Sequence, residues 1–379
     1  MTKKYNKLWS LIILTSILLT GCWDYGDIEK KSIVISIGVD RVDDKIEFST
    51  EVAKLIPKMG EEKGKIETSG VYSDVSIGEN FEKGRLDYDS KRPYPTFLGA
   101  TRVVIFSTNY AKESIEPYLN RINNIYDYRK TVLAVVSRES PRELLKTKVE
   151  NDISVGFFIE DNLNFLSSQG AALYPTIGEL LSDIALGEVG YLLPHVGVEQ
   201  NSVKYLGLAA MKDSRLIDTV NIKDTTGILY ILADSPKFTE VMTSTKNPKN
   251  KISFLSTIKK RKIKTDYVDG KVVIDLHFDL NSLLQYQYYV EPISDDEIKR
   301  LEEMLAEKVK KDIINAIEKS QKKWKCDVFE FARYFRAENP KIYRQIKWLE
   351  EYPDAIINVD ATVTIVNKNL VDPDAKKMY

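Results

Sequence analysis

A short leader that ends in a cysteine constrains this chain more than any other feature. Three lysines within the first seven residues precede an apolar run over residues 8–19, and residues 19–22 read Leu-Thr-Gly-Cys. A basic start, an apolar run and small residues before a cleavage point are typical of a secretory signal peptide. The cysteine directly after Leu-Thr-Gly makes this the lipobox of a bacterial lipoprotein. We therefore expect a signal peptide over residues 1–21 and a lipid on Cys22.

Lipidation of Cys22 decides where the rest of the chain folds. The apolar run of 12 residues is shorter than the ~20 residues that span a bilayer. We expect an S-diacylglycerol and an N-acyl chain on Cys22, and each buried CH₂ group contributes about 0.8 kcal/mol to membrane binding. The mature protein then starts at Cys22, on the outer face of the cytoplasmic membrane, with its body in water. An uncleaved anchor helix and a chance cysteine behind a secretory signal are the alternatives.

The composition excludes one class of partner. With 379 residues the chain is long enough for two or three domains. Its formal net charge is −1, and removal of the three lysines of the leader leaves −4. Because there is no basic excess, nucleic acid is not an expected partner.

Cysteine is sparse in this chain. If Cys22 is lipidated, Cys326 is the one remaining thiol, so no internal disulfide is possible although the compartment permits one. Cys326 lies between Trp324 and Phe329, which indicates a small buried hydrophobic residue. A reactive or intermolecular thiol is the alternative.

The first half of the chain alternates strands with helices. The apolar run over residues 33–40 predicts a buried strand, joined by a turn at 43–45 to a second strand. Capping-box patterns predict helices that start at Ser76 and Thr176, and Ser140 followed by proline predicts a third. The other elements expected here are a loop at 54–68, a helix at 110–122, and strands at 102–106 and 131–136. This order indicates an α/β domain over residues 22–195.

The second half changes character. Pro194 and the polar stretch 199–202 indicate a boundary, followed by a small β-rich middle domain over 196–252. A C-terminal α+β domain over 253–379 completes the chain. Its expected elements are strands at 259–266 and 271–280 around Asp269-Gly270, a long amphipathic helix from Ser294 to about 323, a helix at 328–338, and a closing strand at 357–365. The predicted fold is α+β, with three mixed domains that each hold a β-sheet flanked by helices.

Candidate chemistry is scarce. His195 and His277 are the two histidines, which leaves little for a metal or a general base. Asp275, His277 and Asp279 share one strand face and suit a cation, but alternation with apolar residues explains them equally as a solvated face. The basic run at 259–264 could likewise touch anionic headgroups or simply face water. The sequence has no phosphate loop and no nucleophile elbow.

We therefore predict no catalytic residue, no metal and no cofactor, and lipidation of Cys22 as the one assigned site. Several segments recur in the order and spacing of a known family. They are Gly-Cys-Trp-Asp at 21–24, Ile-Val-Ile-Ser-Ile-Gly-Val-Asp-Arg at 33–41, Gln321, Asp-Val-Phe-Glu-Phe at 327–331, Pro340, Trp348 and the run 357–366. By these segments the chain resembles the Ger(x)C family, the lipoprotein C subunits of spore germinant receptors. It departs from the family at Glu330 and Ala332, where members often carry glycine.

The resemblance implies three domains of mixed sheet and helix, no catalysis, and partnership with two integral membrane subunits, A and B, at the spore inner membrane. The function it implies is a non-enzymatic, lipid-anchored receptor subunit that acts in nutrient-triggered germination. A solute-binding lipoprotein that delivers a small molecule to a transporter is the alternative, and it predicts two α/β lobes that close on a cleft. A cell-wall hydrolase is a third class, and it needs a carboxylate pair or a metal site.

Overall fold

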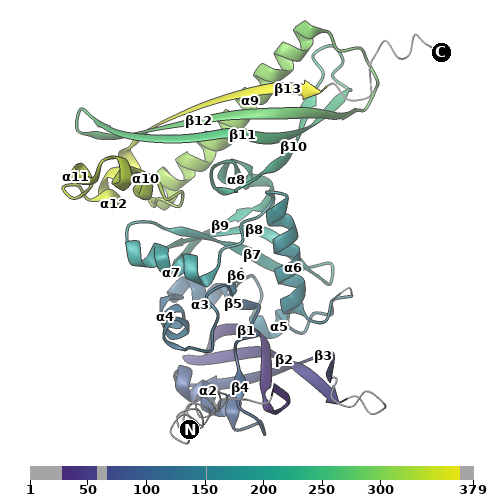
Figure 1. Cartoon of the computed structure of the whole chain (residues 1–379), viewed down its shortest axis with the longest axis vertical. Coiled ribbons are helices and arrows are strands. Elements are labelled where there is room, and N and C mark those ends of the chain that lie inside the picture. Colours follow the sequence, from purple (N-terminus) through teal and green to yellow (C-terminus); the bar gives the residue numbers. More distant parts are fainter. Residues whose placement is uncertain (1–27, 58–65, 151, 368–379) are drawn as a thin grey trace, which may run out of the picture.

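The computed structural model describes residues 28–57, 66–150 and 152–367, so the expected signal peptide and Cys22 lie outside the described residues. Two β-sheets are arranged along the long axis of an elongated molecule (Figure 1). The first sheet lies at the N-terminal end and the second at the opposite end. Among the described residues, no helix combines the length and the apolar character that a membrane crossing needs.

The first sheet has a parallel centre and antiparallel edges. Its strands follow the order β3-β2-β1-β5-β6-β7-β8-β9, and β4 pairs with β1. They are β1 (Ser32–Val42), β2 (Lys45–Pro57), β3 (Ile66–Gly78), β4 (Thr96–Phe97), β5 (Val103–Ser107), β6 (Leu133–Ser137), β7 (Tyr191–Glu199), β8 (Ser202–Lys212) and β9 (Arg215–Asn221). Strands β1, β5, β6 and β7 run parallel. Every residue of β5 and β6 is buried, as expected for parallel strands that are covered on both faces.

Helices cover both faces of the first sheet. They are α2 (Phe81–Asp89), α3 (Thr108–Glu113), α4 (Glu116–Asn124), α5 (Pro141–Leu144), α6 (Val155–Ser168) and α7 (Ile177–Leu186). Val104 and Phe106 of β5 belong to one apolar cluster with side chains of α2, α3, α4 and α7. Val103 and Ile105 point to the other face and join α5 and α6, because successive side chains of a strand alternate between faces.

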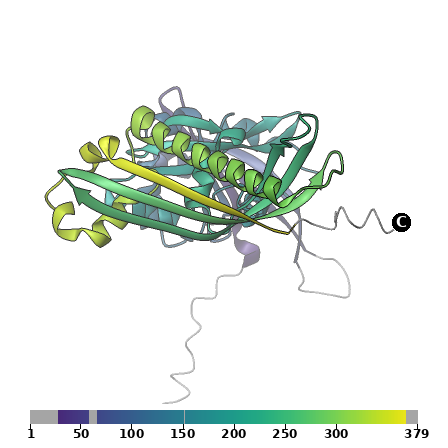
Figure 2. The same cartoon turned by 90° about the horizontal axis from the view of Figure 1, so that it is seen from above.

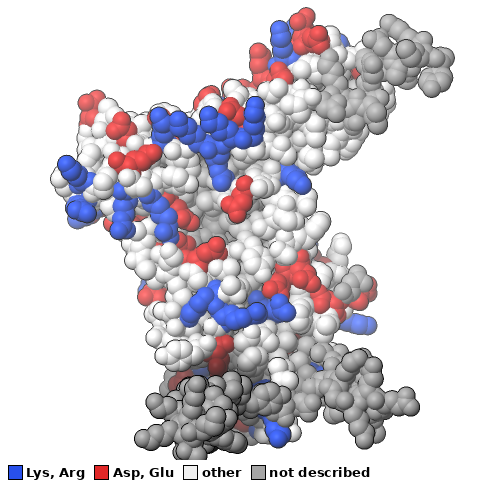
Figure 3. Space-filling model, in the orientation of Figure 1, with Lys and Arg blue, Asp and Glu red and all other residues white. Residues whose placement is uncertain are grey.

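The second sheet is built on one long hairpin. Its order is β10-β11-β12-β13, and the strands are β10 (Lys237–Thr243), β11 (Lys251–Val268), β12 (Lys271–Gln287) and β13 (Ile356–Asn367). Helix α9 (Asp295–Glu318) lies diagonally across one face (Figure 2). The opposite face carries charged side chains, and Lys and Arg gather there in Figure 3. The basic residues of β11 that are exposed include Lys260, Lys262 and Lys264.

Short helices complete the C-terminal half and connect the sheets. They are η2 (Ile222–Asp224), α8 (Thr226–Leu232), the π-helical turn η3 (Lys319–Trp324), α10 (Phe331–Glu338), α11 (Pro340–Tyr343), α12 (Trp348–Glu351) and η4 (Tyr352–Asp354). The helical turn η1 (Ile28–Lys30) instead precedes β1 at the N-terminal end. The α6-covered face of the first sheet and the inner face of the second belong to one apolar cluster, which includes buried side chains of α8.

Several sequence predictions are confirmed. The fold is α+β, and hairpin turns lie at 43–44 and 269–270, each with positive φ at both central residues. Thr176 and Glu179 form the reciprocal capping box at the start of α7. Ser140 caps α5, α9 and β13 lie where the apolar periodicity placed them, and the side chains of β13 alternate as predicted.

Other predictions about local structure are wrong. No helix starts at Ser76, which is buried in β3 and pairs with Phe48 of β2; Asn80 caps the following helix instead. The expected loop at 54–68 holds the end of β2 and the start of β3. Sheet pairing satisfies a whole row of backbone groups, whereas a local capping pattern satisfies two, so the strand prevails.

Three boundaries also move. The helix expected over 110–122 is two helices, because the backbone of Ser114 is extended and a new helix begins at Glu116, with Pro117 in its first turn. The polar stretch at 199–202 is a tight turn between β7 and β8, with positive φ at Gln200 and Asn201. The helix expected from 328 begins at Phe331.

The strands of the predicted middle domain divide between the two sheets. Strand β7 runs through residues 195 and 196, β8 and β9 extend the first sheet, and β10 belongs to the second. The described strands thus form two sheets where the sequence predicted one in each of three domains. The division at 22–195, 196–252 and 253–379 stays a prediction, since sheet membership alone does not define a domain.

Candidate functional site

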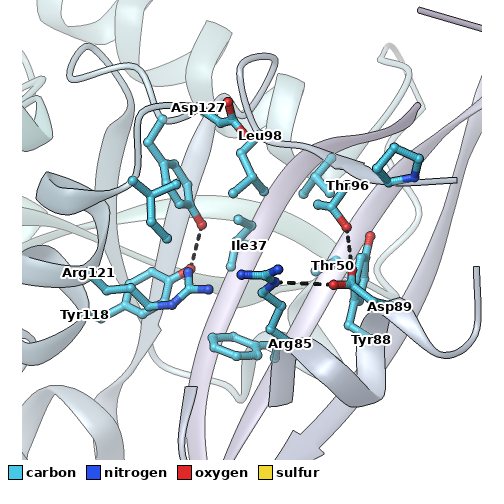
Figure 4. Close-up of a pocket in the computed structure, with 15 residues that line it drawn as sticks. Ile37, Thr50, Arg85, Tyr88, Asp89, Thr96, Leu98, Tyr118, Arg121 and Asp127 are labelled. Carbon is cyan, nitrogen blue, oxygen red and sulfur yellow. Dashed lines mark hydrogen bonds and ion pairs between the residues drawn. The ribbon is translucent and has the colours of Figure 1, made fainter. Parts of the chain in front are cut away.

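A pocket of about 270 Å³ opens between helices α2 and α4 on the first sheet (Figure 4). Its walls are apolar and aromatic, with Ile37 of β1, Phe48 of β2 and Leu98 among them. The lining residues are Val34, Ile37, Phe48, Thr50, Arg85, Tyr88, Asp89, Pro95, Thr96, Leu98, Tyr118, Arg121, Ile125, Asp127 and Tyr128. A mainly apolar cavity with a few polar groups is the usual form of a small-molecule site.

Local sequence features hold these walls in place. The Asn80 side chain accepts a hydrogen bond from the Lys83 N–H and starts α2, which carries Arg85, Tyr88 and Asp89 to the pocket. Ser32 fixes the segment before β4: its N–H donates to the Pro95 carbonyl over 2.9 Å and its hydroxyl to the Tyr94 carbonyl over 3.2 Å.

Aromatic rings form the inner wall. The ring centroids of Phe48 and Tyr118 are 5.8 Å apart, and those of Phe81 and Tyr118 are 5.4 Å apart, edge to face. The hydroxyls of Tyr118 and Tyr128 hydrogen-bond to each other over 2.8 Å. Burial raises the pKa of both phenols, so they remain neutral donors and acceptors at neutral pH.

Charged side chains line the rim. The Arg85 Nε lies 3.3 Å from Oδ2 of Asp89, and Oδ1 of the same carboxylate accepts a hydrogen bond from the Thr96 hydroxyl over 2.9 Å. Arg121 is 12% exposed and its Nε lies 3.3 Å from Glu82. Asp127 is exposed. Charges of both signs around an apolar cavity suit the binding of a small amphipathic molecule.

The predicted strand-face cluster lies far from this pocket, on the outer face of the second sheet. His277 Nδ1 is 2.9 Å from Asp360 and Nε2 is 2.9 Å from Asp279, while Asp275 accepts a hydrogen bond from Asn358 over 2.8 Å. Asp360 and Asn358 are the neighbours of His277 and Asp275 across β12 and β13, whereas Asp279 lies two residues along β12 from His277. The side chains face solvent, as the alternation predicts. Within residues 28–57, 66–150 and 152–367, no three His, Cys, Asp or Glu side chains are grouped to hold a metal.

The sequence analysis also named Cys326, His195 and Cys22. Cys326 is 2% exposed, and burial raises the pKa of its thiol to about 12, so the expectation of a buried small hydrophobic residue is confirmed. His195 of β7 is partly buried, and burial with the nearby Arg138 lowers the pKa of its imidazole. Cys22 lies outside the described residues, and its lipidation stays a prediction.

The sequence did not predict the pocket. Its residues come from β1, β2, α2, the segment around β4, helix α4 and the residues that follow it, and no local motif joins them. In the sequence, Arg85 and Arg121 look like ordinary charged residues of helices. Their position at the pocket becomes visible only in the structure, where α2 and α4 pack side by side on the sheet.

Comparison with known proteins gives a consistent result for both halves. A family model described as spore germination protein N-terminal domain matches residues 24–198, and one described as spore germination B3/GerAC like, C-terminal, matches residues 206–369. The chain is 24% identical to spore germination protein YndF of Bacillus subtilis (strain 168), covering 94% of this chain and 95% of that protein.

Further similar proteins carry names of the same kind. Spore germination protein KC of Bacillus subtilis (strain 168) is 22% identical, with 97% of each chain covered. Spore germination protein GerQC of Bacillus cereus is 21% identical, covering 97% of this chain and all of that protein. The crystal structure of the GerBC protein matches with a TM-score of 0.58 at 18% identity, over 87% of this chain and 97% of that one. That match supports the fold.

Proposed function

Because the chain belongs to the Ger(x)C family of spore germination proteins, we propose that it is a lipid-anchored, non-enzymatic subunit of a spore germinant receptor. The observation that carries the proposal is the lipobox at residues 19–22 in front of a body of this family. The lipid on Cys22 fixes the protein to the outer face of the spore inner membrane. The folded body then presents its surfaces to two integral membrane subunits during nutrient-triggered germination.

The position of the described body supports a short tether. Ile28 belongs to η1, the helical turn before β1, and six peptide units separate it from Cys22. A fully extended chain of that length reaches about 20 Å. The anchor therefore sets both the concentration of the body at the membrane and its distance from the bilayer.

Replacement of the lipidated cysteine tests the proposal. The variant Cys22→Ala, expressed in the spore-forming host, should leave the membrane fraction and impair nutrient-triggered germination, because no acyl chain holds it. Cys326→Ala is the matched control: it removes the chain's other cysteine, which is buried, and should stay in the membrane fraction. The measurements are immunoblots of spore membranes and germination rates.

Two results would contradict the proposal. One is a Cys22→Ala variant that is retained on membranes with unchanged germination. The other is mass spectrometry that finds an intact, unacylated leader on the protein isolated from its host. Copurification of the full chain from spore membranes tests the receptor assembly, since two polytopic proteins should accompany it.

The pocket between α2 and α4 favours a second candidate function, a lipoprotein that binds a solute for delivery to a transporter. Titration of the full chain with amino acids and sugars discriminates between the two. Saturable micromolar binding that is weakened in Arg121→Gln supports the solute-binding function, while the absence of binding leaves the receptor-subunit proposal as stated.

A further inference from the structure

We propose that the free edge of β10 and the adjacent side of α9 bind an extended, acidic segment of a partner protein, which adds a strand to the second sheet. The proposal goes beyond the lipid anchor, because it names a surface that binds protein and the chemistry of the segment that fits it. It does not depend on Cys22, so the two proposals can fail separately.

Strand β10 is an edge strand with an open outer side. It pairs with β11 and, in the described part of the chain, with no other strand (Figure 1). At its start, the N–H of Lys237 donates to the Gln169 carbonyl, which lies outside the sheet. Just after its end, the N–H of Ser244 donates to the carbonyl of Asn250, the residue before β11. These two hydrogen bonds fix which residues of β10 face β11 and which face away.

The backbone groups of three residues of β10 therefore point outward. In an antiparallel pair, successive residues turn their N–H and C=O groups alternately toward the partner strand and away from it. The outward set is the one that contains Lys237, and its remaining members are Thr239, Val241 and Thr243. These groups form a row of donors and acceptors to which a further strand can pair.

The sequence of β10 leaves this edge available. Proteins often block an exposed edge with a proline or a β-bulge, because a free edge is a template for another chain. Strand β10 has no proline, and its register with β11 is continuous over all seven residues. Strand addition to such an edge is an established way to bind an extended peptide, in which the backbone gives affinity and side-chain pockets give specificity.

Helix α9 makes the β10 edge one side of a groove. A hollow of about 670 Å³ is lined by the end of β10 and by one side of α9. Val241 is 49% exposed on the strand side and Met304 is 37% exposed on the helix side. Because side chains of a strand alternate between faces, a strand added beside β10 would place every second side chain against Met304 and Ile314 of α9. The groove thus favours a segment with apolar residues at alternate positions.

The charges of the groove favour an acidic segment. Lys308 lines it but is balanced by two carboxylates of the chain, at 2.6 and 2.8 Å. Lys310 and Lys311 also line it, and neither has a carboxylate at ion-pair distance among the described residues. The one acidic lining residue is Glu307. Carboxylates of a bound segment can therefore pair with lysines that the chain itself leaves unpaired.

A second copy of this chain fits the groove less well. If two β10 edges paired around a twofold axis, the two α9 helices would lie on the same face of the joined sheet. Lys310 and Lys311 of the two copies would then face each other, and like charges across an interface are unfavourable. A segment that carries Asp or Glu between apolar residues meets the same lysines favourably.

Peptide binding to the full chain, isolated from its host in detergent, tests the proposal. The probes are short fluorescent peptides in which Asp or Glu alternates with Val, Leu or Ile. A second set carries Lys in place of the acids, and a third is N-methylated throughout, so that it keeps the side chains but has no N–H to donate to β10. Fluorescence anisotropy measures Kd. We expect acidic peptides to bind with micromolar Kd, and about tenfold more tightly than either other set.

Two variants and a control locate the site on the chain. Val241→Pro removes an N–H group that points away from β11, a position at which an edge strand tolerates proline. Lys311→Glu reverses a charge of the groove without touching the strand. Lys299→Glu is the matched control, because Lys299 is exposed on α9 and does not line the groove. We expect each groove variant to weaken peptide binding about tenfold and the control to leave it unchanged, with circular dichroism showing that all three are folded.

Several results would overturn the proposal. They are the binding of no acidic peptide, equal binding of basic and acidic peptides, and unchanged binding by folded Val241→Pro and Lys311→Glu. Dimerisation of the unaltered chain that is lost in both groove variants would also overturn it, in favour of a second copy at this edge. All of these measurements are made in detergent and without a membrane, so such a failure leaves the lipid-anchor proposal as stated.

Discussion

The two sheets of this protein differ in how many of their faces are covered by helices. The first sheet is covered by helices on both faces, and its central strands are buried along their whole length. The second sheet is covered by α9 on one face, and the strand β12 alternates between buried and more exposed side chains. A sheet that is covered twice needs apolar side chains at every position, whereas a sheet that is covered once needs them at every second position.

Each half also buries a carboxylate at the start of a helix. Glu51 of β2 accepts hydrogen bonds from the backbone N–H groups of Val155 and Gly156 at the start of α6, each over 2.9 Å. Asp327 accepts the N–H groups of Phe329 and Ala332 before and within α10, over 3.0 and 2.8 Å. A hydrogen-bond acceptor is favoured there because the first N–H groups of a helix have no partner within it, although burial raises the pKa of both carboxyl groups.

The two carboxylates differ in what else they join. Glu51 also accepts the Ser36 hydroxyl over 2.5 Å, which ties α6 to β1 in the first sheet. Asp327 accepts the indole N–H of Trp348 over 3.1 Å, so it joins α10 to α12, and its carbonyl accepts the Gly190 N–H at the edge of β7. The Asp327 carboxylate therefore joins two helices of the second half, the Glu51 carboxylate joins a helix to a strand of the first, and the backbone carbonyl of Asp327 connects the halves.

We expect the largest effect from Asp327→Ala. It leaves two backbone N–H groups and an indole N–H buried without an acceptor, which costs about 3–5 kcal/mol in the free energy of unfolding. Denaturant unfolding of the full chain measures it. Asp354→Ala, at an exposed position of η4, is the control and should change stability by less than about 0.5 kcal/mol. A similar small loss for both variants would show that the buried Asp327 carboxylate does not stabilise the packing of α10 on α12.

The pH dependence of stability also tests the contribution of the Asp327 carboxyl group. Burial raises the pKa of Asp327 to about 6, above its value of about 4 in an unfolded chain. The folded state thus binds more protons between pH 4 and 6, so this residue's contribution is fully present below pH ~4 and is lost as pH rises through ~6. Asp327→Asn should flatten the fall in stability over this range. An unchanged slope would assign the effect to Asp183, whose pKa burial also raises to about 6.

A smaller and more local effect is expected from Glu51→Gln. An amide of the same size keeps one acceptor but turns an N–H group toward donors, which costs about 2 kcal/mol. Because Glu51 serves α6 alone, amide hydrogen exchange should accelerate in α6 while α9 stays protected. Equal acceleration in both helices would mean that the two halves unfold as one unit and that the Glu51 carboxylate does not stabilise α6 alone.

Structural features that depend only on neighbouring residues in one segment were predictable from the sequence. The alternation along β12 and β13, the turn at Asp269-Gly270 and the capping box at Thr176 each depend on a few neighbouring residues. The pattern at Ser76 misled because pairing with β2 outweighs a local cap. At Ser294 the cap is present, but the Glu297 carboxylate turns to Lys246, 2.6 Å away, instead of back to the helix start.

Residues whose role depends on distant segments were not predictable. In an alternating strand Glu51 reads as a solvated position, yet it is 1% exposed because α6, about a hundred residues later, starts above it. Tyr118 and Arg121 meet the wall of the pocket only after α4 packs on β1 and β2.

The smallest effect, from His277→Ala, tests whether the second sheet is open to solvent on its outer face. His277 contacts Asp279 and Asp360 on that face, and its side chain is 38% exposed. Exposed ion pairs contribute little because water competes for both charges, so the change in the free energy of unfolding should be within about 0.5 kcal/mol. Thermal unfolding of the isolated full chain measures the effect on stability, and spore germination rates measure the effect on function. A loss of germination without a loss of stability would mean that a partner covers this face in the receptor, and the second sheet would then be covered twice like the first.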